Sequence, residues 1–424
     1  MKLFFVVYFL FLPFQWALSL SEGVDLAIIR LVTLAGFLFW LALSLAKKEL
    51  KLPQGWAIVV FFFFLFFTTL SLFWSENWHF SARKIVFILS FAPLFLMLCS
   101  WLETSIEDYG VLLKAYVGGA FLMGILGVSI FFAQFLFGVE TVFSFLVRDM
   151  LPFFLGEAFA ASVAAYPSLL VNISGMTLLR ASGVFPDPHM FSYYIGMATP
   201  LAFAFWLREK PKARWWLGIA LLLLLADLLS FSRGGYVGLM GAVLVFLFGE
   251  RDYFLSRMRS TIILVVLSIS MLLLATQTPF GARFTSIFSP SDGSNQERFR
   301  LWEEAAGHMS DRPLLGVGIG NYPLLVKPGI SYREPLYAHN LYLDIAVETG
   351  LVGLGFFLGL VLVAIVRLVR TYRLTADPLA LALLSSLTLF LTHSLFETPL
   401  FSVHVFPVLL LLLALGVSYK GRSA

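Results

Sequence analysis

The sequence contains few charged residues. Asp, Glu, Lys and Arg make up 13% of its 424 residues, whereas hydrophobic residues make up 60%. A soluble domain carries about a quarter of its residues as charged ones. A chain this apolar cannot solvate its own surface, so its composition excludes a soluble protein and predicts a polytopic membrane protein. The net charge of +4 is small, and we expect no nucleic-acid partner.

Cysteine is almost absent, and long polar intervals are few. The one cysteine, Cys99, lies inside an apolar run, which excludes a disulfide within the chain and argues against a thiolate metal site. No polar interval is long enough to form a separate soluble domain. We therefore expect residues 1–424 to form a single transmembrane domain.

Apolar runs of roughly 20 residues, the length that spans a bilayer as a helix, occur throughout the chain. The first run could be a signal peptide. Because it is long and another run follows it at once, we interpret it as a retained helix. The predicted fold is all-α, with about twelve transmembrane helices near residues 3–20, 24–46, 54–74, 84–101, 111–137, 187–207, 215–231, 234–249, 260–279, 346–366, 379–396 and 399–418.

Lysine and arginine predict the orientation. With the N-terminus in the cytoplasm and alternating spans, most basic residues fall in compact cytoplasmic loops, such as the one containing Arg208 and Arg214. This is the distribution that the positive-inside rule predicts, and it leaves both termini in the cytoplasm. An extra span over Phe159–Leu179 would reverse everything downstream. We interpret residues 138–180 instead as an external segment of helices at the membrane surface.

Twelve basic residues, most of them arginine, fall at the external ends of spans, against this bias. The planar guanidinium suits bidentate binding of phosphate or carboxylate, so the group predicts an external site for a phosphorylated, membrane-borne substrate. Individual members could instead pair with nearby carboxylates or anchor to lipid headgroups. The twelve are Arg30, Arg83, Lys84, Arg148, Arg180, Arg233, Arg283, Arg298, Arg300, Arg312, Lys327 and Arg333.

The longest polar interval, between the ninth and tenth spans, carries the densest set of candidate residues. Residues 280–345 are predicted to form a large periplasmic catalytic loop. Arg298 and Trp302 are four residues apart and share one face of a short helix. The stretch Gly316–Gly320 lacks the βαβ frame of a dinucleotide site and is interpreted as a flexible, close-packed connection near the site. His339, in a His-Asn pair with Asn340, is suited to take a proton from a hydroxyl.

Further polar residues stand at span ends. Arg233, in the sequence Ser-Arg-Gly-Gly, lies in an external hairpin, where an arginine needs an anionic partner. Glu348 and Asp344 could orient His339 or an acceptor sugar, or pair with an arginine. His393 and Glu397, four apart, are interpreted as a structural hydrogen bond. A zinc site built from these residues, His189 and His339 is the alternative, but no metal is expected.

The order of these motifs resembles the O-antigen ligase/polymerase superfamily of bacterial inner-membrane proteins. The matching stretches, from Arg180 to Phe401, are ASGVFPDPHMFSYYIG, SRGG, RFRLWEEAAGHMSDRPLLG, GVGIGNY, YAHNLYLDIAVETGLVGL and HSLFETPLF. His189 stands where asparagine is usual in the family.

The resemblance implies a helical fold of the glycosyltransferase C type and a periplasmic site that transfers a glycan from undecaprenyl diphosphate without a metal or cofactor. His339 would be the general base, and Arg233 and Arg298 would bind the diphosphate. Arg180 and Arg300 are added as candidate diphosphate ligands, and Asn340, Glu348, His393 and Glu397 as supporting residues. We expect an inner-membrane O-antigen ligase that uses lipid A-core as acceptor. The alternatives are an O-antigen polymerase, a protein-glycosylating relative and a transporter of lipid-linked sugars.

Overall fold

The computed structural model describes residues 1–21, 24–48, 53–104, 108–165, 168–173, 175–209, 214–249, 293–332, 334 and 336–421. The protein is mostly helical, with 77% of the structure in helices, as expected for an all-α membrane protein. The longer helices are α1 (Lys2–Phe11), α2 (Ile28–Ala46), α3 (Trp56–Leu70), α4 (Trp78–Thr104), α5 (Tyr109–Phe137), α9 (Pro188–Arg208), α10 (Arg214–Leu229), α11 (Arg233–Gly249), α15 (Gly293–Asp311), α17 (Leu341–Thr375), α18 (Pro378–His393) and α19 (Val405–Ser418).

Many of these helices are built to cross a membrane. Within the described part of the chain, six are long and apolar enough by length and composition alone: Ile28–Ala46, Trp56–Trp74, Trp78–Glu103, Tyr109–Phe137, Pro188–Arg208 and Leu341–Thr375. Shorter apolar helices cover Lys2–Phe14, Arg233–Gly249, Pro378–His393 and Val405–Ser418. The expected ninth span, 260–279, lies outside the described residues, so the count of twelve stays a prediction.

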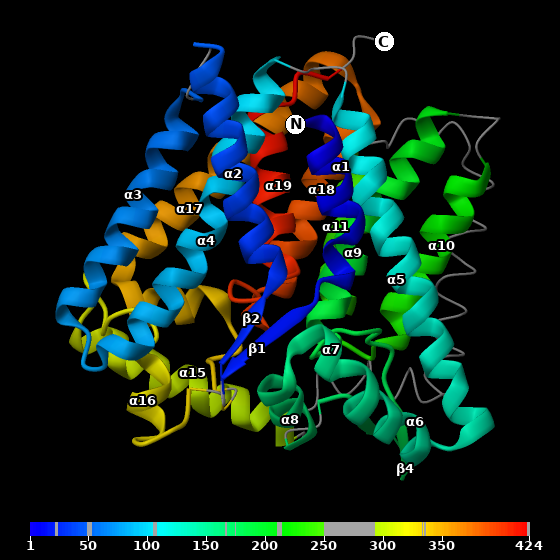
Figure 1. Ribbon diagram of the computed structural model, residues 1–424, viewed down its shortest axis with the longest axis vertical. Helices are drawn as coiled ribbons and strands as arrows, with labels where there is room; N and C mark the ends of the chain where they lie inside the picture. The colour runs from blue at the N-terminus through cyan, green and yellow to red at the C-terminus, as the bar shows by residue number, and fades with distance from the viewer. Residues whose placement is uncertain are drawn as a thin grey trace.

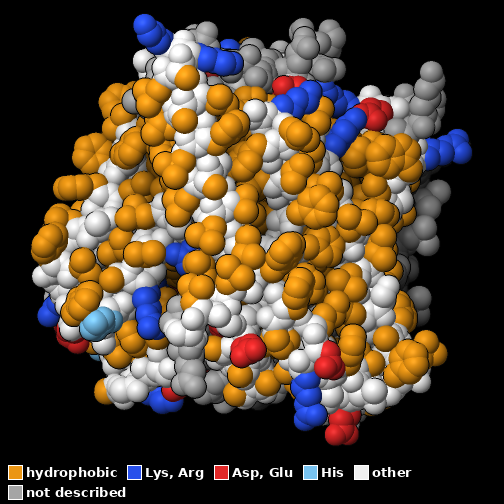
Figure 2. Space-filling view, viewed as in Figure 1, with side chains coloured by type: hydrophobic (Ala, Val, Ile, Leu, Met, Phe, Trp, Pro, Cys, Tyr) orange, Lys and Arg blue, Asp and Glu red, His pale blue; other side chains and the backbone are white. Residues whose placement is uncertain are grey.

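The helices run between two ends of one bundle (Figure 1). Helix α15 and the short helices α6 (Val139–Phe145), α8 (Glu157–Ala165) and α16 (Tyr322–Val326) gather at the lower end in this view, together with both β-hairpins. The two ends of the chain lie toward the upper end. Hydrophobic side chains cover the broad middle of the face shown in Figure 2. The long polar loop and the segment 138–180 therefore share one end of the bundle, as the predicted topology requires.

A β-hairpin replaces the end of the first expected span and the start of the second. Strands β1 (Ala17–Ser21) and β2 (Val24–Ala27) pair antiparallel, with Leu18 opposite Leu26. The predicted helical bounds 3–20 and 24–46 are therefore wrong around this turn, because α1 ends at Phe11 and α2 begins at Ile28. The alternation of apolar and polar residues in Ala17–Ser21 is the strand period, which a search for apolar runs overlooks.

The segment 138–180 consists of short elements rather than a further span. It contains α6 (Val139–Phe145), a π-helical turn (Leu146–Met150), α7 (Leu151–Leu155), α8 (Glu157–Ala165), and strands β3 (Leu170–Ile173) and β4 (Met176–Leu179). Gln134, near the end of α5, fixes the hairpin: its side chain donates to the Leu179 carbonyl and accepts from the Leu179 amide. The strands were not expected, since only helices were predicted here.

Helices α9, α10, α11 and α18 form the packed centre that carries part of the site. Two glycines of the Ser-Arg-Gly-Gly motif allow this packing. A Cβ on Gly234 would lie 2.5 Å from His393 Cδ2 of α18, and one on Gly235 would lie 2.0 Å from Ser192 Oγ of α9. Both glycines lie inside α11, so they serve close helix packing rather than a turn of the hairpin.

Candidate functional site

His339 and Glu397 are joined directly, although 58 residues separate them in the chain. Nδ1 of His339 lies 2.9 Å from Oε2 of Glu397. The Glu397 side chain is 8% exposed and that of His339 is 35% exposed, so a buried carboxylate holds an imidazole that reaches the surface. When Nδ1 carries the proton, Nε2 is the basic nitrogen, which is the arrangement that a general base needs.

The second oxygen of Glu397 binds an arginine. Nη2 of Arg298, from α15, lies 2.8 Å from Oε1 of Glu397, and Nε2 of His189, from α9, lies 3.6 Å from the same oxygen. Glu397, in the loop after α18, thus gathers side chains from three other parts of the chain. The predicted base His339 and the predicted phosphate ligand Arg298 meet on this one carboxylate.

The charges of this cluster tune its titrating groups. Burial alone would raise the pKa of Glu397, but His189, His339 and Arg298 outweigh burial and hold that pKa well below its usual range. Burial also acts to lower the pKa of His339, yet the Glu397 carboxylate has the larger net effect and raises it. Glu397 is therefore ionised at neutral pH, and it makes His339 a stronger base.

The backbone amide and carbonyl of Ala338, the residue before His339, both form hydrogen bonds with side chains. The Ala338 amide donates to Oδ1 of Asp344 at 2.9 Å, and Nε1 of Trp302 donates to the Ala338 carbonyl at 2.8 Å. His339 itself has a φ of 48°. Such a left-handed conformation costs a non-glycine residue about 1–3 kcal/mol and persists only where its surroundings fix it. The contacts from Asp344 and Trp302 supply that constraint.

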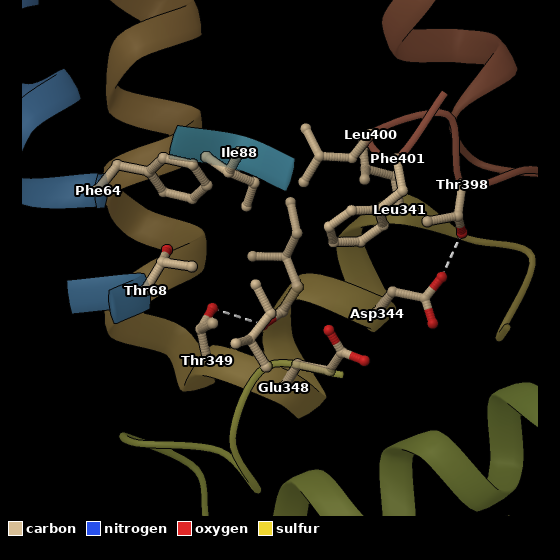
Figure 3. A pocket seen from close by; sticks show the side chains of 12 residues that line it. Phe64, Thr68, Ile88, Leu341, Asp344, Glu348, Thr349, Thr398, Leu400 and Phe401 are labelled. Atoms are coloured by element: carbon tan, nitrogen blue, oxygen red, sulfur yellow. Dashed lines mark hydrogen bonds between the residues drawn. The ribbon is translucent and has the colours of Figure 1, made fainter. Parts of the chain in front are cut away.

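The start of α17 ties the His339 segment to the loop that carries Glu397. Asn340 caps the helix by accepting from the amides of Tyr342 and Leu343, at 3.1 Å each. Asp344, one turn later, also accepts a hydrogen bond from the hydroxyl of Thr398, the residue after Glu397 (Figure 3). The helix begins at Leu341, five residues before the predicted span, because this capping extends it past the apolar run.

Arg180 and Arg233 stand beside this cluster, and their residues are only 3% and 5% exposed. Nε of Arg180 donates to the Ser230 carbonyl at 2.7 Å, which fixes it to the chain just before Arg233, the first residue of α11. Arg180 is close enough to Arg233 and Glu397 to interact electrostatically with both. Three of the four predicted phosphate ligands thus converge on the Glu397 neighbourhood.

Ser232 links the arginine-bearing turn to two histidines. Its hydroxyl lies 2.8 Å from Nδ1 of His189 and 3.3 Å from Nε2 of His393. His393 does not form the expected i, i+4 hydrogen bond with Glu397, since α18 ends at His393 and the carboxylate turns to His339 and Arg298. That expectation assumed that the helix continued through Glu397, and it was wrong.

Arg300 and Glu348 are placed differently from the central group. Arg300 forms exposed ion pairs with Glu297 and Glu304 on α15. Glu348 pairs with Lys84 of α4 at 2.9 Å, rather than with an arginine or His339. Of the roles considered for Glu348, the structure therefore favours an ion pair, in which the cation is a lysine rather than an arginine.

The glycine-rich stretch packs against the beginning of α17. The amides of Val317 and Gly318 donate to the carbonyls of Val347 and Glu348, both at 2.9 Å. Gly350 has a φ of 69° inside α17, and a Cβ there would lie 2.0 Å from the Leu314 carbonyl oxygen. The close packing of this connection is as the sequence predicted.

A small, mostly apolar pocket lies behind this part of α17, between α3, α4 and the loop after α18. Asp344 and Glu348 both line it (Figure 3). Both acids also have partners within the protein: Glu348 pairs with Lys84 of α4, and Asp344 accepts from the Ala338 amide and the Thr398 hydroxyl. We therefore assign these acids structural contacts rather than substrate contacts.

Sequence reasoning missed the contact of His189 with Glu397 and that of Trp302 with the Ala338 carbonyl, whereas it named the orientation of His339 as one option for Asp344. One usable signal was spacing: Asn340 and Asp344 are four apart, as are Arg298 and Trp302, so each pair shares a helix face. The second pair does act together, because Arg298 reaches Glu397 and Trp302 reaches Ala338. Among the described residues, no group of three or more His, Cys, Asp or Glu side chains is arranged to hold a metal ion.

Comparison with known proteins supports one family. Residues 218–358 match the family model described as O-antigen ligase, a range that includes Arg233, Arg298 and His339. The chain is also 26% identical over 178 residues to a curated protein of Haemophilus influenzae described as uncharacterized. That similarity covers 38% of this chain and 44% of the relative, so it spans less than half of either protein.

Proposed function

We propose that the chain, whose residues 218–358 match the O-antigen ligase family model, acts as an O-antigen ligase. In this proposal it takes a glycan from undecaprenyl diphosphate and transfers it to a sugar hydroxyl of lipid A-core at the periplasmic face of the inner membrane. Its membrane character and the ligase or polymerase type of activity follow from the apolar helices and the family. The donor, acceptor and orientation are the proposed part.

The proposed reaction is a direct displacement at C1 of the carrier-linked sugar. The acceptor oxygen forms a bond to C1 while the bond from C1 to the diphosphate oxygen breaks. The acceptor proton passes to Nε2 of His339, and the lipid diphosphate leaves with the bonding electron pair. Displacement from the opposite face inverts the anomeric centre. Positioned proton transfer of this kind is typically worth about 10²–10⁴-fold in rate.

The contact between His339, Glu397 and Arg298 is the observation that carries the proposal. It joins a base that reaches the surface to a fixed positive charge, at 2.9 and 2.8 Å through the same carboxylate. A base must meet the acceptor hydroxyl while a cation meets the leaving diphosphate, so the two groups must lie close together. Arg180 and Arg233, also in this neighbourhood, add charge that stabilises the departing diphosphate without a metal.

An O-antigen polymerase would use the same groups, because it differs in the acceptor rather than in the chemistry at C1. The surface glycan of a deletion strain tests the assignment. Loss of a ligase leaves full-length polymer on undecaprenyl diphosphate and bare lipid A-core. Loss of a polymerase leaves lipid A-core carrying one repeat unit, and this second profile would overturn the ligase proposal. Complementation with the wild-type chain should restore the normal profile, whereas complementation with His339→Ala should not.

A further inference from the structure

Two arginines lie outside the group assigned to the donor, at the external end of α2 and α4. Arg30 of α2 donates from Nε to Ser90 Oγ at 2.9 Å and from Nη2 to the Val86 carbonyl at 3.2 Å, and both acceptors belong to α4. These acceptors are neutral, so they orient the guanidinium without cancelling its charge.

Arg83 completes a pair with Arg30 on the same face of α4. Its guanidinium lies over the ring of Tyr332, 4.7 Å from the ring centroid, and Arg30 is close enough to interact electrostatically with Tyr332. Arg83, Val86 and Ser90 recur at the spacing of one helix face. The two guanidinium groups are therefore neighbours around a single aromatic side chain.

The surroundings of this pair are apolar and face outward. Leu31 and Val32 on α2, and Val86 and Leu89 on α4, are all more than one third exposed. Figure 2 shows Lys and Arg side chains interrupting the hydrophobic surface on this side of the molecule. Among the described residues, neither Arg30 nor Arg83 forms an ion pair with a carboxylate. Basic residues at a membrane surface attract the anionic groups of lipids.

The chain leads from this pair to the proposed base. Tyr332 contacts Arg83, and Tyr337, five residues on, lies near Lys84, whose Nζ is 5.4 Å from the Tyr337 ring centroid. His339 follows two residues later. Glu348 neutralises the charge of Lys84. The positive charges without a carboxylate partner among the described residues are therefore those of Arg30 and Arg83, at the lipid-facing end of this segment.

We propose that Arg30 and Arg83 bind a phosphate of the lipid-linked acceptor, so that its sugar end lies along the segment from Tyr332 to His339. This inference rests on the proposed function, because it assigns the second substrate of the same reaction. Donor and acceptor are then held by different arginine sets, with His339 between them. A paired guanidinium site suits a phosphate monoester or diester, which each arginine can bind in bidentate fashion.

Direct binding tests the inference independently of transfer. The full chain is placed in nanodiscs of phosphatidylcholine, which adds no net anionic lipid, and titrated with a fluorescent glycolipid carrying phosphate monoesters and with the same glycolipid after removal of its phosphates. We expect the wild-type protein to bind the phosphorylated form about tenfold more tightly, the size of one lost charge-assisted contact. Arg30→Gln/Arg83→Gln should abolish this preference, and Arg148→Gln, at an exposed external arginine elsewhere, should keep it.

Three outcomes would overturn the inference. The double variant could retain the preference, the wild-type protein could show none, or vesicles of phosphatidylglycerol could displace the glycolipid with equal affinity, which would make this a site for bulk lipid. Arg83→Gln alone, at an exposed position, provides the test if the double variant does not fold. A wild-type protein that binds the phosphorylated glycolipid but transfers no glycan would refute the proposed ligase and leave this site standing.

Discussion

Asp344 accepts a hydrogen bond from Thr398, although 54 residues separate them, and the same carboxylate accepts one from the Ala338 amide. Ala338 precedes His339, and Thr398 follows Glu397. One buried side chain therefore fixes the spacing of the two groups that form the proposed catalytic pair.

Replacing Asp344 by Asn should slow transfer without weakening donor binding. The amide keeps one acceptor oxygen and turns an NH₂ group toward the second donor, so one of the two links is lost. We expect kcat to fall about 10- to 100-fold, as is common when a catalytic group is displaced by about 1 Å. Thr398→Val also removes one link, but it turns no second donor toward a donor and should have a smaller effect. A donor Kd that rises as much as kcat falls would contradict a positioning role.

Replacing Glu397 by Gln should shift the pH dependence of transfer. The Glu397 carboxylate raises the pKa of His339, and a general base works only when neutral, so wild-type activity falls as pH drops through that raised pKa. Without the negative charge, the pKa of His339 decreases. The acidic limb of the pH–kcat profile should then move to lower pH, at a reduced maximum. A limb that stays in place would show that Glu397 does not tune the base.

Arg298 and Arg300 provide a matched pair on α15. Arg298 reaches the buried Glu397, whereas Arg300 lies in exposed ion pairs with Glu297 and Glu304. Arg298→Ala should weaken binding of a lipid-diphosphate donor by about 10- to 100-fold, a typical range for a charge-assisted contact. Arg300→Ala should weaken it less than about threefold, because exposed ion pairs contribute little. Equal effects would support the sequence-based prediction for Arg300 over its structural placement.

Gly350 and Gly355 test the fit between the glycine-rich stretch and α17. Gly350 has a φ of 69°, and a Cβ there would lie 2.0 Å from a backbone oxygen, whereas nothing lies within 4 Å of a Cβ on Gly355. Gly350→Ala should therefore destabilise the protein by at least about 1–3 kcal/mol and lower its melting temperature in detergent. Gly355→Ala should leave it unchanged or raise it slightly. Similar temperatures for the two variants would contradict the packing described for Gly350.

The sequence predicted the groups of the site better than their connections. His339, Arg233 and Arg298 were assigned to one side of the membrane from charge distribution and motif order, and the structure places His339 and Arg298 on one carboxylate. Glu397 was assigned to His393 instead, because counting four residues assumes a continuous helix, and α18 ends at His393. No local pattern reveals a partner 58 residues away.

The same limit explains the errors in the fold. The hydrophobic runs located most membrane helices, because the bilayer imposes a length that a sequence window can recognise. They missed the hairpin of β1 and β2, where the strand period lies inside an apolar stretch. Asp25 of β2 accepts hydrogen bonds from Ser19 and from the amide of Phe159, and only the tertiary structure shows why an acid stands there.

The most direct test of the account is transfer by purified His339→Ala protein in proteoliposomes, with undecaprenyl-diphosphate-linked glycan as donor and lipid A-core as acceptor. Donor binding is measured on the same preparation. We predict that the variant binds donor with the wild-type Kd and forms glycosylated product at least about 100-fold more slowly, the loss expected for a general base. Product formation at the wild-type rate would contradict the assignment of His339 as the base.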